Sequence, residues 1–208
     1  MKGKKQDLRI EAARQRESLP PSEVHSRSQM IQEAAIRFAP YLAARAVALY
    51  SPIGNEVFTG RIRDHAFETR KFVYYPGHGD TQRPILIRVQ SVGDLQPGRY
   101  GILESAGDQS VPVGGQEGLA VFVPGLSFDL WGHRLGRGKG WYDRLLRDLR
   151  GRATFIALAY EFQIVDNVPV DALDQRVQHI ITESRMIDCR DVDSSRVGFR
   201  AQSKVKGV

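Results

Sequence analysis

The segment GLSFDLWGHRLGRGKGWYDRLL, residues 125–146, carries residue types that suit the binding of an anion. It gathers glycines and interleaves cations between them, and these residues are Gly132, Gly136, Gly138, Gly140, Arg134, Arg137 and Lys139. Clustered glycines allow the backbone to turn sharply or to approach a ligand closely. Because exposed backbone N–H groups before a helix N-terminus bind phosphate, the segment predicts a phosphate site. A solvated turn before a helix is the alternative interpretation.

Two established phosphate motifs do not fit this segment. A P-loop has four residues between its first glycine and Gly-Lys, and Ser or Thr follows. Here five residues separate Gly132 from Gly138, and Gly140 follows Lys139. A dinucleotide fingerprint has Gly-x-Gly-x-x-Gly directly after a strand, whereas Gly136, Gly138 and Gly140 alternate about ten residues beyond the expected strand. The prediction therefore depends on the general chemistry of phosphate and on neither motif.

Two acids and a histidine in the same segment have several interpretations. Asp143 lies in the first turn of the expected helix, where an acid either stabilises the helix N-terminus or ligates Mg²⁺ beside bound phosphates. Asp129 is a candidate for holding the backbone of the loop. His133 is a lone loop histidine, and we expect a spectator and not a catalyst.

The elements that must position this segment alternate along the chain. Helices are expected over residues 4–19, 22–38, 59–69 and 141–150, and strands over residues 45–50, 71–76, 85–90, 119–125, 154–160 and 177–183. Ser22 is expected to cap the second helix and Pro40 to stop it, while residues 93–118 are expected to form a loop. The pattern predicts a single three-layer α/β/α domain with a mostly parallel sheet over residues 1–190. A basic, flexible tail is expected over residues 191–208.

Two loops follow buried strands in this scheme. SPIGNE, residues 51–56, follows the first strand, and residues 124–140 follow the fourth. Ligands of open α/β sheets bind beyond the carboxyl ends of the strands. Both loops are therefore expected to reach one binding site.

Composition limits the function classes. Thirty Lys and Arg residues against 24 Asp and Glu residues give a net charge of +6, which fits nucleic acid, a membrane surface or a small polyanion. The basic residues do not form one tract, and no apolar run approaches the ~18 residues that cross a bilayer. The start of the chain lacks the apolar core of a secretory signal, and Cys189 is a single cysteine. We expect a cytoplasmic protein, and the charge alone does not choose among these three kinds of ligand.

The stretch FVPGLSFDLWGHRLGRGKGWYDRLL resembles the signature of the 5-formyltetrahydrofolate cyclo-ligase family. KQDLR, SPIGNEVFT, GRYGILES and ALAYEFQIVDNVPVDALDQRVQHIITE resemble further family segments, so the resemblance spans nearly the whole chain. It implies ATP- and Mg²⁺-dependent conversion of 5-formyltetrahydrofolate to 5,10-methenyltetrahydrofolate, with ADP and phosphate released. ATP would phosphorylate the formyl oxygen before N10 attacks, so no enzyme nucleophile is needed. A folate- or nucleotide-binding paralogue without turnover is the alternative.

The resemblance also implies roles for individual residues. The catalytic residues are Arg137, Lys139 and Tyr142, and the metal-binding acids are Asp143 and Asp174. The nucleotide contacts are Lys5, Arg9, Arg134, Leu135, Gly136, Arg137, Gly138, Lys139, Gly140, Trp141 and Tyr142. The folate contacts are Ser51, Glu56, Gly138, Lys139, Gly140 and Trp141, with Glu56 as the pterin-binding acid. We expect a monomer whose partner is the small-molecule substrate, without nucleic acid or membrane.

The chain departs from the family pattern at several positions. Phe58 stands where the family often has aspartate, and Trp141 replaces the first tyrosine of the usual pair. Ser105 replaces a common proline, and Gln178 stands where an acid is frequent. Phe58 and Gln178 are the departures that bear on folate and metal binding.

Overall fold

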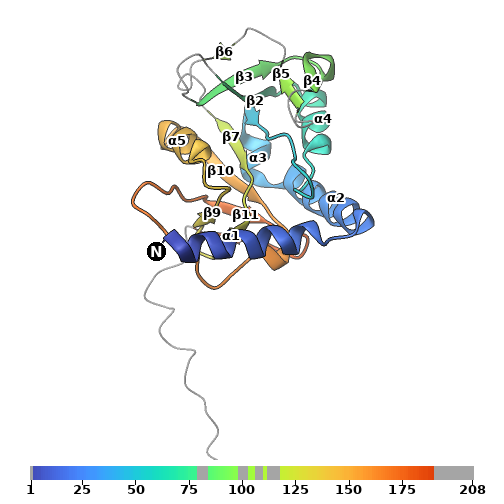
Figure 1. The fold of residues 1–208 in the computed structure, drawn as a ribbon. Coiled ribbons are helices and arrows are strands. Elements are labelled where there is room, and N and C mark those ends of the chain that lie inside the picture. The colour runs from blue at the N-terminus through green and yellow to red at the C-terminus, as the bar shows by residue number, and fades with distance from the viewer. Residues whose placement is uncertain (1, 79–83, 98–102, 106–109, 112–117, 190–208) are drawn as a thin grey trace, which may run out of the picture.

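The core of the protein is an eight-stranded mixed sheet in the computed structural model, which describes residues 2–78, 84–97, 103–105, 110–111 and 118–189 (Figure 1). In spatial order the strands are β12 (Met186–Asp188), β11 (His179–Ile181), β10 (Ala153–Leu158), β7 (Leu119–Val123), β1 (Ala46–Ala48), β2 (Phe72–His78), β3 (Pro84–Val89) and β6 (Ser110–Val111). The five strands from β11 to β2 are parallel to one another, and β12, β3 and β6 pair antiparallel at the two edges. The mostly parallel sheet is confirmed.

Helices cover both faces of the sheet and make the three-layer α/β/α architecture. The helices are α1 (Lys2–Glu17), α2 (Pro21–Arg37), α3 (Ala39–Ala43), α4 (Gly60–Glu68) and α5 (Trp141–Asp148). Val47 of β1 packs into a core with α2, α3 and α4, whereas Ala46 and Ala48 face a second core with Leu145 and Leu146 of α5. Successive side chains of a strand point to opposite faces, so one apolar run supplies both cores.

Among the α-helices of the described residues, α1 has a different position from the other four. α1, drawn in dark blue in Figure 1, contacts the loops that follow β7 and β1. Arg16 of α1 donates to the Gly125 carbonyl, just beyond β7, over 3.1 Å. Asn55, in the loop beyond β1, donates to the Arg16 carbonyl over 3.1 Å. α1 therefore lies against both strand-end loops.

Several details of the expected elements were wrong. Ser22 is not the cap of α2, because Pro20 occupies the N-cap position and Pro21 begins the helix. Proline suits this first position, where its missing N–H would have no partner in the helix. α2 ends at Arg37, and Pro40 does not end helical structure because it lies in the first turn of α3.

Short strands were missed. The expected loop over residues 93–118 contains β4 (Leu95–Pro97), β5 (Leu103–Ser105) and β6, and β12 follows the last expected strand. A 3-10 helix (Val92–Asp94) precedes β4, and another (Glu161–Gln163) follows β10. The remaining pair, β8 (Ser127–Phe128) and β9 (Arg134–Leu135), is antiparallel and lies within the glycine-rich segment. The basic tail expected over residues 191–208 lies outside the described residues.

Candidate active site

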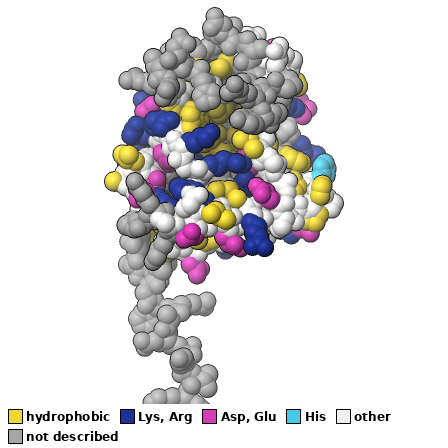
Figure 2. Space-filling model, in the orientation of Figure 1, with side chains coloured by type: hydrophobic (Ala, Val, Ile, Leu, Met, Phe, Trp, Pro, Cys, Tyr) yellow, Lys and Arg dark blue, Asp and Glu magenta, His cyan; other side chains and the backbone are white. Residues whose placement is uncertain are grey.

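A cavity of about 610 Å³ opens beyond the carboxyl ends of the neighbouring parallel strands β1 and β7. The loops after these strands both line it, as expected from the sequence. It brings together all the predicted site residues, namely Lys5, Arg9, Ser51, Glu56, Arg134, Leu135, Gly136, Arg137, Gly138, Lys139, Gly140, Trp141, Tyr142, Asp143 and Asp174. Lys and Arg side chains gather across the middle of the face in Figure 2. The cavity is large enough for a drug-sized ligand.

Asp129 holds the hairpin that leads into the cavity. Its side chain is fully buried, and its carboxylate accepts hydrogen bonds from the N–H groups of Trp131, His133 and Val168 at 3.0–3.1 Å. His133 Nδ1 lies 2.9 Å from the same carboxylate. The expectation that Asp129 fixes the loop is confirmed. His133 supports this hairpin and is not one of the described residues that line the cavity.

The glycines of this segment have two different roles. Gly132 has a φ of 81°, and a Cβ atom there would lie 2.2 Å from the Val177 carbonyl oxygen, so its role is packing. Gly138 and Gly140 have φ values of 94° and 63° and line the cavity. A side chain would strain these left-handed conformations. Glycine therefore allows the backbone conformation of the cavity wall at Gly138 and Gly140.

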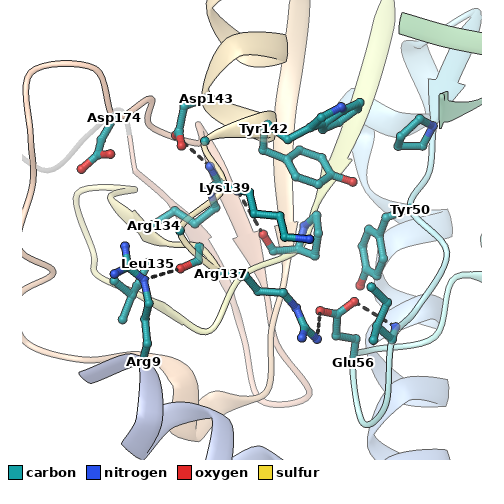
Figure 3. A pocket seen from close by; sticks show the side chains of 18 of the residues that line it. Arg9, Tyr50, Glu56, Arg134, Leu135, Arg137, Lys139, Tyr142, Asp143 and Asp174 are labelled. Atoms are coloured by element: carbon teal, nitrogen blue, oxygen red, sulfur yellow. Dashed lines mark hydrogen bonds and ion pairs between the residues drawn. The ribbon is translucent and has the colours of Figure 1, made fainter. Parts of the chain in front are cut away.

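The three cations of the loop are held differently. The Arg134 guanidinium, largely buried, donates to Asp143 over 2.8 Å and to the Pro124 carbonyl over 3.3 Å. Arg137 donates to Glu56 over 3.0 Å. Lys139 is exposed, its side chain extends into the cavity in Figure 3, and its ammonium has no hydrogen bond or ion pair within the described chain. Lys139 is therefore the cation most available to a ligand.

α1 contributes two further cations to the cavity. Lys5 Nζ contacts Asp171 at 2.7 Å and Asp174 at 2.6 Å, and Arg9 Nε donates to the Gly136 carbonyl over 3.0 Å. Burial acts to lower the pKa of Lys5, but the hydrogen bonds and charges of the two aspartates outweigh it and raise that pKa. Both cations are thus fixed before any ligand binds.

Asp143 and Asp174 line the cavity, but each is paired with a cation. Asp143 Oδ1 accepts from Arg134, and Asp174 Oδ2 accepts from Lys5, which leaves the second oxygen of each carboxylate without a partner among the described residues. In the same part of the chain, no group of three His, Cys, Asp or Glu residues could hold a metal ion. Mg²⁺ binds phosphate oxygens together with one or two carboxylates, so the free oxygens fit such an ion.

The family model described as the 5-formyltetrahydrofolate cyclo-ligase family matches residues 1–183. The chain belongs to this family. It is 27% identical over 195 residues to 5-formyltetrahydrofolate cyclo-ligase of Mus musculus, covering 86% of this chain and 93% of that protein. The protein of the same name from Haemophilus influenzae is 27% identical over 174 residues, covering 82% and 93%.

Solved structures of similar proteins share this fold. The NMR structure of Aquifex aeolicus 5,10-methenyltetrahydrofolate synthetase has a TM-score of 0.79 and 30% identity, covering 95% of this chain and 99% of that one. The corresponding synthetase of Mycoplasma pneumoniae has a TM-score of 0.69 and 25% identity, covering 86% and 98%. No helix among the residues described here is long and apolar enough to cross a bilayer.

Two aromatic residues at the start of α5 present polar groups at the cavity of this cyclo-ligase family member. Burial raises the pKa of Tyr142, so its hydroxyl stays protonated, and that hydroxyl has no partner in the described part of the protein. Trp141 Nε1 is buried, and it too is unpaired there. The two rings meet edge to face with centroids 4.9 Å apart. Unpaired donors in a cavity are candidates for ligand contacts.

Of the departures from the family pattern, Trp141 lines the cavity, whereas Phe58 and Gln178 do not. Phe58 lines a neighbouring cavity of about 490 Å³, which meets the first at Ser51. Gln178 Oε1 accepts from the Phe155 N–H over 2.6 Å, so it links β10 to the segment before β11. Most of the segment GRYGILES lies outside the described residues.

The sequence interpretation missed residues that support the predicted ones. Asp171 shares the Lys5 ammonium with Asp174, and Arg16 contacts Glu56 at 3.5 Å. Helical spacing contained a signal for Arg16, because positions 5, 9 and 16 lie on one face of a helix. The burial of that face depends on contacts with loops distant in the sequence, which the spacing does not reveal.

Proposed function

We propose that the protein is an ATP- and Mg²⁺-dependent 5-formyltetrahydrofolate cyclo-ligase. The observation that carries this proposal is the 3.0 Å contact between Arg137 of the glycine-rich loop and Glu56 of the loop after β1. This contact joins a cationic environment, suited to phosphate binding, and a buried carboxylate within one cavity. A reaction between ATP and a folate requires both environments side by side.

The nucleotide is proposed to occupy the side of the cavity formed by α1 and the glycine-rich loop. Lys5, Arg9 and Arg134 are fixed by their own partners, so their donor groups are already oriented when a nucleotide binds. Arg137 and Lys139 are exposed, and they are proposed to neutralise the phosphate that is transferred. The backbone of residues 135–142 completes this side.

The pterin is proposed to bind at Glu56, with Ser51, Trp141 and the glycines at 138 and 140 as neighbours. A carboxylate accepts two N–H donors from one edge of a pterin. Glu56 is 6% exposed, and the Ile53 N–H donates to its Oε2 over 3.1 Å, which fixes the carboxylate. A prepositioned acceptor of this kind orients the formyl group relative to the phosphate.

The proposed reaction has two steps. The N5-formyl oxygen attacks the γ-phosphorus of ATP while the bond to ADP breaks, and N10 then attacks the activated formyl carbon. The carbon–oxygen bond breaks, the oxygen leaves with phosphate, and the N10 proton is lost. The cations stabilise the charge that develops on the phosphoryl oxygens, and the Tyr142 hydroxyl can donate a hydrogen bond to one of them.

Asp143 and Asp174 are the residues proposed to hold Mg²⁺, each through its unpaired carboxylate oxygen. The ion would supply positive charge to the phosphates of ATP. Arg134 fixes the orientation of Asp143, and Lys5 fixes that of Asp174. We also propose that the protein acts as a cytoplasmic monomer, without nucleic acid or membrane as a partner.

An ultraviolet absorbance assay tests the proposal directly. Purified protein with 5-formyltetrahydrofolate, ATP and Mg²⁺ should form the conjugated methenyl product, and omission of ATP should prevent it. Product without ATP would refute the proposed mechanism. Tight binding of both substrates without product would indicate a binding paralogue.

A further inference from the structure

Arg16 is a buried cation near the end of α1, and it does not line the cavity within the described chain. Its side chain is 4% exposed, and burial lowers the pKa of its guanidinium. Nη2 lies 3.5 Å from Glu56 Oε1, and Nη1 donates to the Gly125 carbonyl over 3.1 Å. Nε is also buried and has no partner among the residues described. Burial of an arginine costs desolvation energy, and its contacts with Glu56 and the Gly125 carbonyl offset part of that cost.

The loop that carries Glu56 also contacts the end of α1. Asn55 Nδ2 donates to the carbonyls of Arg16 and Leu19 at 3.1 Å each, and to that of Glu17 at 3.3 Å. The last carbonyls of a helix lack partners within the helix. Arg16 therefore contacts the loop while Asn55 of the loop satisfies the helix end, and the two segments fix each other.

Glu56 has a second cation beside it, Arg137, but that side chain is much more exposed than Arg16. The Arg137 side chain is 49% exposed and belongs to the glycine-rich loop, whereas Arg16 is enclosed. An anion in the cavity would compete with Glu56 for Arg137. Arg16 then remains as the cation that holds the carboxylate.

We propose that Arg16 is a positioning residue that fixes the Glu56 carboxylate toward the cavity, independently of Arg137. The pterin then meets an acceptor that is already oriented, and Arg137 is free to contact phosphate. The role assigned to the pterin rests on the proposed function. The effect of Arg16 on the loop that carries Glu56 does not depend on the proposed function, and it can be measured without any ligand.

Hydrogen exchange on the free protein tests the contact itself. In Arg16→Met, the amides of residues 51–57 should exchange about tenfold or more faster, because Glu56 loses its buried partner. Arg16→Lys keeps the charge but has a single donor group for Gly125 and Glu56, so an intermediate effect is expected. Arg14→Met is the matched control, since Arg14 is exposed on the same helical turn and its side chain has no partner in the described chain.

Binding measurements test the consequence. Arg16→Met should weaken 5-formyltetrahydrofolate on the order of ~10-fold in the absence of nucleotide. ATP affinity should stay within about twofold, because Lys5 and Arg9 keep partners of their own. In a Glu56→Gln background, Arg16→Met should weaken folate no further, as expected if Arg16 acts through that carboxylate.

Three results would overturn the inference. The first is unchanged exchange at residues 51–57 in Arg16→Met. The second is an equal loss of folate and ATP affinity with a lower melting temperature, which would indicate only a structural role. The third is an equally large loss of folate affinity on Arg16→Met substitution in the Glu56→Gln background. Failure of the wild-type protein to bind folate would instead refute the proposed function. The exchange data would still show whether Arg16 fixes the loop that carries Glu56.

Discussion

Replacing Lys139 with methionine should lower turnover on the order of ~10²-fold and leave the stability of the free protein unchanged. The ammonium of Lys139 has no ion pair or hydrogen bond to lose among the described residues, and the side chain is exposed. Exposed substitutions of this kind change the free energy of unfolding by about 0.5 kcal/mol or less.

The expected loss of rate follows from the charge of the transferred phosphate. Two unit charges about 4 Å apart interact by about 4 kcal/mol at an effective dielectric constant near 20. Solvation of the free ammonium offsets part of this energy. A remaining loss of about 2.7 kcal/mol in the transition state corresponds to the ~10²-fold effect.

The assay compares kcat, the KM for ATP and the melting temperature of wild type and Lys139→Met. Arg147→Met is the matched control, because Arg147 is an exposed cation on α5 whose side chain has no partner in the described structure. The control should retain wild-type turnover. A kcat within threefold of wild type for Lys139→Met, or a loss fully explained by unfolding, would refute the reasoning.

Four further predictions concern single residues. Glu56→Gln should weaken the binding of 5-formyltetrahydrofolate and leave ATP affinity unchanged, because the amide presents a donor where the pterin needs an acceptor. A folate affinity equal to that of wild type in calorimetry would contradict this. Asp143→Asn should raise the Mg²⁺ concentration for half-maximal rate with little change in melting, since its amide oxygen still accepts from Arg134; an unchanged Mg²⁺ titration would refute the metal role. Asp129→Asn should lower the free energy of unfolding by about 1–3 kcal/mol in urea titrations, because four donors contact its buried carboxylate; wild-type stability would argue against the loop role. Burial raises the pKa of Cys189 to about 12, so at pH 8 the thiol is protonated and iodoacetamide should modify it far more slowly in folded than in unfolded protein; equal rates would refute that burial.

The sequence predicted the centre of the fold well because burial leaves a strong local pattern there. The apolar runs around Val47 and Val121 belong to β1 and β7, which are covered on both faces. Their position also placed the two loops that line the cavity correctly, since the carboxyl ends of parallel neighbours lie together. The site was therefore predictable from its strands as well as from its loop composition.

The edges of the sheet were less predictable because their strands depend on pairing. Val111 in β6 pairs with Leu86, and Met186 in β12 pairs with Ile181. Strands of two or three residues have no periodicity to detect. The pairing of Glu56 with Arg137 was equally hidden, because it joins loops that are 81 positions apart.

The position of α1 has a consequence for the order in which the protein folds during synthesis. Lys5 precedes its partner Asp171 by 166 positions, and Arg9 precedes Gly136 by 127. At about 5–20 residues per second, a ribosome needs roughly ten to thirty seconds to supply the last of these partners after the helix has emerged. During that interval the basic face of α1 is without its acidic counterpart and is open to anionic surfaces such as ribosomal RNA. The lining of the cavity can be completed only near the end of translation, so a chain stalled before Asp171 would expose this face to chaperones and nucleic acid.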